Sequence, residues 1–165
     1  MLTLETTIAL DGLSGDEFTD FMLTCDDTRY RAWWPGTHRQ FHVRRAGPGE
    51  DHVGDVVWMD EYVGRRHLRM AAAVVDVVPG RRIVWQLRPW RLRPPVRLTL
   101  AFDPQEDGAV VRHVLTAGWA GWARVLDPVW RLYFSPTFAH DLDRHARTEF
   151  GRLPHLLHPD DDPTP

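Results

Sequence analysis

Alternation of apolar and polar residues between positions 37 and 118 is the feature that most constrains the fold. Six segments alternate there with a period of two, and each ends at glycine or proline punctuation such as Pro79-Gly80 or Pro94-Pro95. Side chains of a strand point to opposite faces in turn, so this pattern indicates strands that are buried on one side. The six expected strands span residues 37–45, 54–62, 66–78, 81–90, 95–103 and 109–118.

The short connections between these segments decide how the strands pair. Parallel neighbours need a crossover of a dozen residues or more, whereas a connection such as Val63-Gly64-Arg65 suits only an antiparallel hairpin. The sheet is therefore expected to be an antiparallel meander. Leu2 to Leu10 shows the same alternation and predicts one further strand at the N-terminus.

Two short helices are expected between the first strand and the rest of the sheet. Ser14 with Glu17 three residues later forms a capping-box pattern, and apolar residues follow it at helical spacing. A second helix is expected from Asp26 or Asp27 to Trp33, where Pro35-Gly36 stops it.

A long C-terminal helix follows the last strand. Asp127-Pro128 is a helix start with proline at the first helical position, and apolar residues recur as far as Leu153. Ser135-Pro136 interrupts the pattern and predicts a kink or a restart at that point.

Length and composition fit one globular domain. The chain has 165 residues, of which 43% are hydrophobic, and we expect a single domain over residues 1–158 with a disordered acidic tail over 159–165. Residues 1–10 lack the basic start and the long apolar run of a signal peptide, and no stretch approaches 18 apolar residues. We therefore expect a cytoplasmic protein without stable membrane insertion.

The charge pattern argues against nucleic acid as a partner. All 20 basic residues are arginine, and 23 acidic residues balance them, so no overall basic footprint exists. The arginine-rich stretch from Arg88 to Arg97 is a local exception. It fits either a solvated hairpin tip or a patch for a membrane surface or another anionic partner.

Motifs for metals, nucleotides and serine hydrolysis are missing from the sequence. The nine histidines form no His-Glu-x-x-His pattern, and neither a phosphate loop nor Gly-x-Ser-x-Gly occurs. We accordingly expect no metal and no cofactor. The one cysteine, Cys25, fits a buried inert thiol, with a catalytic thiol as the alternative.

The order of the expected elements resembles the START-like superfamily, also called SRPBCC. The stretches that carry the resemblance are Trp33-Trp34-Pro35, the hairpin from Val77 to Trp85 and the long helix from Asp127. The resemblance implies an α+β helix-grip fold, in which a seven-stranded curved antiparallel sheet surrounds a long C-terminal helix, with two short helices after the first strand. It also implies a cavity between sheet and helix for a lipid, a polyketide or another apolar molecule. Carriers and polyketide cyclases share this plan, so the fold does not choose the chemistry.

Strand parity predicts which side chains would line such a cavity. Asp76 is taken to lie on the outer face of its strand, and charged residues identify the outer faces of the other strands. Trp34, at the end of the second helix, is expected at the cavity mouth. The expected lining is Trp34, His67, Ala71, Ala73, Trp85, Leu87, Leu98, Leu100, His113, Leu115, Phe138 and Leu142.

His145 and Glu149 lie four residues apart on the long helix, and Glu149 falls within its apolar arc. A carboxylate that faces the sheet needs a partner, and either Arg69 or a histidine is expected to pair with it. Two hypotheses follow. In the first, these groups form a structural ion pair in a protein that binds a small apolar ligand. In the second, His145, Glu149 and Arg69 serve a polyketide cyclase or dehydratase as acid, base and anion-stabilising groups.

The segment from Trp119 to Leu126 adds apolar surface between the last strand and the last helix. It fits a lid over the cavity, and a membrane contact or a homodimer contact is the alternative.

Overall fold

The computed structural model describes residues 1–47, 51–88 and 95–159. Seven strands form one sheet in the order β1-β7-β6-β5-β4-β3-β2, and every neighbouring pair is antiparallel. The predicted meander is thereby confirmed, with the first strand added beside the last. The strands are β1 (Leu2–Asp11), β2 (His38–Arg44), β3 (Val56–Val63), β4 (Arg66–Val78), β5 (Arg82–Leu87), β6 (Val96–Gln105) and β7 (Gly108–Ala117).

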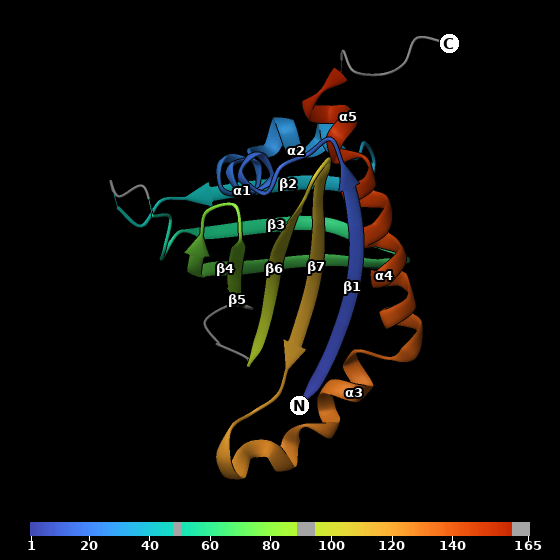
Figure 1. Cartoon of the computed structure of the whole chain (residues 1–165). Helices are drawn as coiled ribbons and strands as arrows, with labels where there is room; N and C mark the ends of the chain where they lie inside the picture. Colours follow the sequence, from blue (N-terminus) through green and yellow to red (C-terminus); the bar gives the residue numbers. More distant parts are fainter. Residues whose placement is uncertain (48–50, 89–94, 160–165) are drawn as a thin grey trace.

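The sheet is strongly curved, so that β2, β3 and β4 run across the direction of β1, β6 and β7 (Figure 1). Helices cover the hollow side and the ends of this sheet. They are α1 (Gly15–Thr24), α2 (Asp27–Trp33), the 3-10 helix η1 (Gly121–Leu126), α3 (Pro128–Tyr133), α4 (Pro136–Gly151) and α5 (Leu153–Leu157).

Local capping explains where the helices begin. The Ser14 side chain accepts a hydrogen bond from the Glu17 amide, and the Glu17 side chain accepts one from the Ser14 amide, which completes the predicted capping box of α1. The Asp26 side chain caps α2 by accepting hydrogen bonds from the Thr28 and Arg29 amides. The long C-terminal helix restarts as predicted, because the Ser135 side chain caps α4 and Pro136 occupies its first position.

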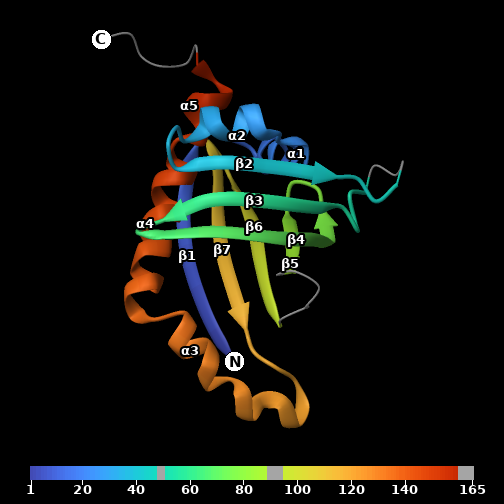
Figure 2. The same cartoon turned by 180° about the vertical axis from the view of Figure 1, so that it is seen from behind.

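Helix α4 connects two distant parts of the sheet (Figure 2). On β1, the Thr6 hydroxyl donates a hydrogen bond to Asp143 Oδ1 at 2.9 Å. On the other side, the turn between β3 and β4 holds Gly64 at a φ of +58°, and a Cβ there would lie 2.3 Å from Asp141 Oδ2. The absence of a side chain at Gly64 therefore lets α4 approach the end of β3.

The buried apolar residues form two clusters. The larger one fills the space between α1, α2 and the sheet around Phe18, Phe21 and Phe102. The smaller one lies at the α3 end of the sheet around Val63, Phe134 and Phe138. An unfilled cavity remains beside the smaller cluster, as described below.

Strand β4 corrects one prediction from strand parity. Its pairing with β5 shifts between Val74 and Asp76, so Val75 is an extra residue in a β-bulge. Asp76 does face outward and pairs with Arg82. The bulge, however, turns each residue of β4 that precedes Val75 to the face opposite the one assigned by counting back from Asp76. The prediction that His67, Arg69, Ala71 and Ala73 face inward is therefore wrong. The inward residues are Leu68, Met70, Ala72 and Val74.

Two predictions fall outside the described residues. The arginine-rich stretch from Arg88 to Arg97 includes residues 89–94, and the tail includes residues 160–165. Within the described part of the chain, no helix has the length and the apolar character that a membrane crossing requires.

Candidate functional site

A cavity of about 390 Å³ lies between the hollow face of the sheet and helices α3 and α4. Eight residues of the predicted lining border it from β4, β5, β6, β7 and α4, and the α3 region adds aromatic side chains. The predicted residues on its wall are His67, Trp85, Leu87, Leu98, His113, Leu115, Phe138 and Leu142. The further aromatic ones are Trp130, Tyr133 and Phe134.

The other predicted lining residues do not border the cavity. Leu100 is fully buried in the larger core cluster, and Ala71 and Ala73 face the outer side of β4. His67 and Arg69 reach the cavity edge, but their polar ends turn outward to Asp60, with Nε2 of His67 at 2.6 Å and Nε of Arg69 at 3.0 Å from its oxygens. Arg69 is thus the partner of Asp60 and does not pair with Glu149.

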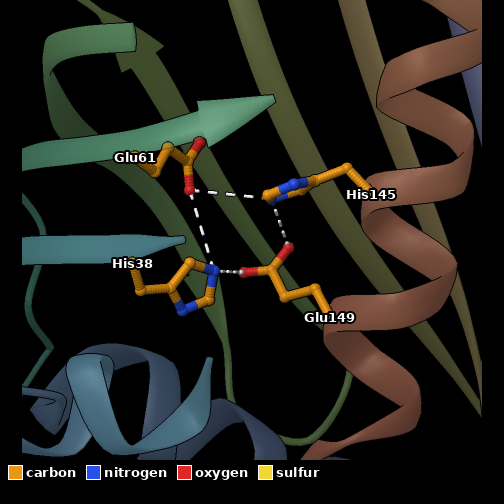
Figure 3. A group of neighbouring side chains, drawn as sticks. All are labelled: His38, Glu61, His145 and Glu149. Carbon is orange, nitrogen blue, oxygen red and sulfur yellow. Dashed lines mark ion pairs between the residues drawn. The ribbon is translucent and has the colours of Figure 1, made fainter. Parts of the chain in front are cut away.

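His145 and Glu149 meet two residues that the sequence reasoning missed, His38 and Glu61 (Figure 3). His38 and Glu61 are register partners across β2 and β3, while His145 and Glu149 stand one turn apart on α4. One ligand-type atom from each residue lies within 4.8 Å of those from the other three, and all four residues are buried. We call this group the His-Glu cluster.

The distances within the His-Glu cluster are short. Nε2 of His38 lies 3.3 Å from Glu149 Oε1, and Nε2 of His145 lies 3.5 Å from Glu149 Oε2. Glu61 Oε2 is 3.9 Å from the His38 nitrogen and 3.8 Å from the His145 nitrogen. Within the described residues, neither Nε2 atom makes a hydrogen bond.

Helix α2 supports the cluster from behind. The Tyr30 ring stacks on the His38 ring with centroids 3.9 Å apart, and the Tyr30 hydroxyl donates a short hydrogen bond to Glu61. Nδ1 of His38 lies 3.2 Å from the Tyr30 carbonyl oxygen. A carbonyl can only accept, so Nδ1 carries the proton, and Nε2 of the neutral ring presents a lone pair to the cluster.

Burial shifts the protonation of the cluster. Desolvation raises the pKa of Glu149 to about 7, and the charge of His145 opposes part of that rise. Desolvation and the neighbouring Glu149 also raise the pKa of Glu61. For His38, desolvation is the largest cause and lowers the pKa to about 4. Burial therefore favours the neutral forms of His38, Glu61 and Glu149.

The paired tryptophans have different positions. Trp33 is buried in the core, and its Nε1 donates a 2.7 Å hydrogen bond to the Glu149 carbonyl, which ties α2 to α4. Trp34 stacks on His145 with ring centroids 4.9 Å apart, and the Arg152 guanidinium lies 5.1 Å from the indole. Trp34 thus covers the His-Glu cluster and does not border the cavity.

Glu61 connects the cluster to the cavity. It borders the cavity wall together with His113, whereas His145 and Glu149 lie behind it. Burial lowers the pKa of His113 to about 4, with a smaller contribution from His145. Glu61 and His113 therefore place two buried titratable side chains on the wall of this largely apolar cavity.

The sequence did contain a signal for Glu61. Met59, Glu61 and Val63 share one face of β3, and a carboxylate between two inward apolar residues indicates a buried charge that needs a partner. His38 had no such signal, because the pairing irregularity between His38 and Gln40 sets its direction.

The described structure favours the inert interpretation of Cys25. The thiol is buried, and desolvation raises its pKa to about 12, so no appreciable thiolate forms near neutral pH.

Comparison with protein-family models gives no match, and comparison with curated protein sequences gives none either. Solved structures do match. MLL2253 from Mesorhizobium loti is 12% identical with a TM-score of 0.60, and the match covers 97% of this chain and 99% of that one. Ara h 8.0201 is 10% identical with a TM-score of 0.60, over 94% of this chain and 97% of that one.

A third match is the di-domain ARO/CYC StfQ from the steffimycin biosynthetic pathway. It is 15% identical with a TM-score of 0.56, and the match covers 94% of this chain but 49% of StfQ. This chain therefore corresponds to about one half of that protein. The likeness to these three structures spans nearly the whole chain and confirms the predicted helix-grip fold.

Proposed function

We propose that this protein binds a small, largely apolar molecule in the cavity between the sheet and helices α3 and α4. The observation that carries the proposal is the unfilled volume of about 390 Å³, which falls in the range of about 300–1,000 Å³ common for ligand sites. The wall is mostly aliphatic and aromatic, so a bound molecule would gain from burial of apolar surface.

The polar end of the cavity indicates how such a molecule would be oriented. Of the titratable groups on the wall, Glu61 and His113 are buried, whereas His67 and Arg69 are exposed. A ligand with a hydroxyl or carbonyl group at one end and an aromatic or aliphatic body would satisfy this arrangement. Lipids, polyketides and aromatic metabolites belong to this chemical class.

A variant that fills the cavity tests this proposal. Leu98→Trp adds volume on the inward face of β6, and Thr99→Trp adds the same side chain one residue later on the outward face. Leu98→Trp is expected to weaken binding of the fluorescent probe anilinonaphthalene sulfonate at least about tenfold, since a filled pocket excludes the probe, whereas Thr99→Trp is expected to bind like the wild type. Native mass spectrometry of the purified protein would identify a molecule that co-purifies. Equal binding by both variants would contradict the proposed location.

A second candidate function is turnover of the bound molecule by a cyclase or dehydratase mechanism. One observation favours it, namely that His113 and Glu61 place buried titratable groups on the wall of a largely apolar chamber. StfQ, which is described as an ARO/CYC protein, has the same fold. Arg69 has no role in this cyclase or dehydratase mechanism. His145 and Glu149 would position Glu61 from the side that faces away from the cavity. If the His113→Gln variant still forms product from a polyketide-type substrate, the turnover hypothesis is contradicted.

We also propose that two copies of the chain associate through η1 and α3. These segments expose several large apolar side chains, among them Trp122 and Leu132. The cytoplasmic location expected from the sequence stays a prediction.

A further inference from the structure

We propose that His38, Glu61, His145 and Glu149 bind one divalent transition-metal ion, best matched by Zn²⁺, and that this ion clamps α4 to β2 and β3. The inference goes beyond ligand binding in the cavity, which does not require it. It also departs from the expectation of no metal, because the ligands come from three separate elements and form no contiguous sequence motif.

The first support is the spacing of the four ligand atoms. Zn²⁺ binds imidazole nitrogen and carboxylate oxygen at about 2.0–2.2 Å with tetrahedral geometry, so neighbouring ligand atoms should lie roughly 3.3 Å apart. The two histidine nitrogens lie 3.3 Å and 3.5 Å from Glu149 oxygens. The distances from Glu61 Oε2, 3.8 Å and 3.9 Å, need to contract by only about half an ångström.

The second support is the position of the two histidine Nε2 atoms. The side chains of His38 and His145 are 0% and 6% exposed, and within the described residues Nε2 of each ring lacks a hydrogen bond (Figure 3). Both nitrogens point at carboxylate oxygens, which are themselves acceptors. Buried acceptors that face one another are costly unless a proton or a cation lies between them. One metal ion would satisfy all four atoms at once.

The third support is the arrangement around the ligands. A metal-bound histidine commonly donates its other ring nitrogen to a backbone carbonyl, and His38 Nδ1 does so to Tyr30. A metal-bound carboxylate is commonly held by a further hydrogen bond, and Glu61 receives one from the Tyr30 hydroxyl. Tyr30 therefore orients two of the four ligands.

The charge of the His-Glu cluster also favours a bound divalent cation. The two ionised glutamates would carry two negative charges into the interior, and among the described residues neither forms an ion pair with an arginine. A divalent cation neutralises both. Two imidazoles with two carboxylates favour Zn²⁺ or a related first-row ion over Mg²⁺ or Ca²⁺, which bind mainly oxygen.

The experiment uses the full chain after removal of metal with a chelator, titrated with Zn²⁺ and, as a spectroscopic probe, with Co²⁺. The wild type is expected to bind one ion per chain and to gain about 5–10 °C in Tm at saturating Zn²⁺, because the ion binds the folded state alone. Co²⁺ is expected to give visible absorption bands of tetrahedral intensity. The variants Glu149→Gln and His145→Gln are expected to lose at least about 100-fold in affinity, since each removes a ligand.

A matched control is His158→Gln, because His158 Nε2 also lies near a glutamate, 2.9 Å from Glu17 Oε1, but outside the cluster. It is expected to bind Zn²⁺ like the wild type. Circular dichroism of the metal-free proteins reports whether each variant folds, and Glu61→Gln replaces any variant that does not. Failure of the wild type to bind one ion per chain, or equal affinity in the folded cluster variants, would overturn the proposal. Probe binding in the cavity is measured separately, so the two proposals can fail independently.

Discussion

His38 at the start of β2 and Glu149 in the last turns of α4 meet with Nε2 and Oε1 3.3 Å apart. The contact joins the edge region of the sheet to the helix that the sheet surrounds. Both side chains are buried, and Tyr30 of α2 holds the His38 ring from the other side by stacking. The cluster is therefore part of the structural link between three elements, and its supporting contacts should be measurable as stability.

Tyr30→Phe is expected to lower the free energy of unfolding by about 1–3 kcal/mol, because the buried Glu61 carboxylate loses its hydroxyl donor while the ring stack with His38 remains. Urea unfolding of the metal-free protein measures the change. The control is Tyr62→Phe, since the Tyr62 hydroxyl accepts an exposed 3.3 Å hydrogen bond from the Arg39 guanidinium. That variant should stay within about 0.5 kcal/mol of the wild type. A comparable loss in both variants would contradict the support assigned to Tyr30.

The bulge at Val75 predicts opposite outcomes for two neighbouring alanines. Ala72 faces the core and is 0% exposed, so Ala72→Asp buries an unpaired carboxylate and should unfold the protein or cost more than about 4 kcal/mol. Ala71 faces the outer side of β4, and Ala71→Asp should cost about 1 kcal/mol or less. Thermal denaturation of both variants gives the comparison. If Ala71→Asp were more destabilising than Ala72→Asp, the inward residues would be those expected for a β4 strand without a bulge.

The two alanines also show how far sequence reasoning reached. Period-two alternation and short connections predicted all seven strands, since these signals depend only on nearest neighbours along the chain. A bulge has no comparable signal, because it depends on how two strands pair, and it reversed the assigned faces of His67 and Arg69. Residues from strands without a bulge, such as Trp85 and Leu98, faced the cavity as expected.

The candidate site likewise contains residues that the sequence could pair and residues that it could not. His145 and Glu149 could be paired from helical spacing alone, as an i and i+4 contact. Their partners His38 and Glu61 come from strands far away in sequence, and only the curvature of the sheet brings β2 and β3 against α4. Helix spacing is local information, whereas sheet curvature is a property of the whole fold.

His113 should give the protein a specific dependence on pH. In the unfolded chain an ordinary histidine has a pKa near about 6.5, whereas burial holds the folded pKa at about 4. Between these values the unfolded state takes up the proton and the folded state does not, so the free energy of unfolding falls as the pH falls from about 6.5 toward 4. The contribution of this one group amounts to roughly 3 kcal/mol.

His113→Phe should remove that part of the pH dependence while it keeps an apolar cavity wall against Phe150. The charged groups of α4 that act on His113, namely His145 and Asp143, are unchanged in this variant. Urea unfolding at several pH values, each compared with the same protein at pH about 7.5, isolates the effect. The exposed His155 provides the control, and His155→Phe should retain the slope of the wild type. An unchanged slope in His113→Phe would contradict the buried neutral state.

The exposed apolar side chains of η1 and α3 predict self-association. Trp122 is 88% exposed, Leu132 is 83% exposed and Val125 is 72% exposed, which is unusual for side chains of this size. If two copies bury these side chains against each other, light scattering should give the mass of two chains at high protein concentration, and a double variant with Trp122→Ser and Leu132→Ser should give the mass of one. Val78→Ser, on the outer face of β4, removes an exposed apolar side chain elsewhere and should leave the dimer intact. A wild-type protein that stays monomeric over the whole concentration range would rule out this contact.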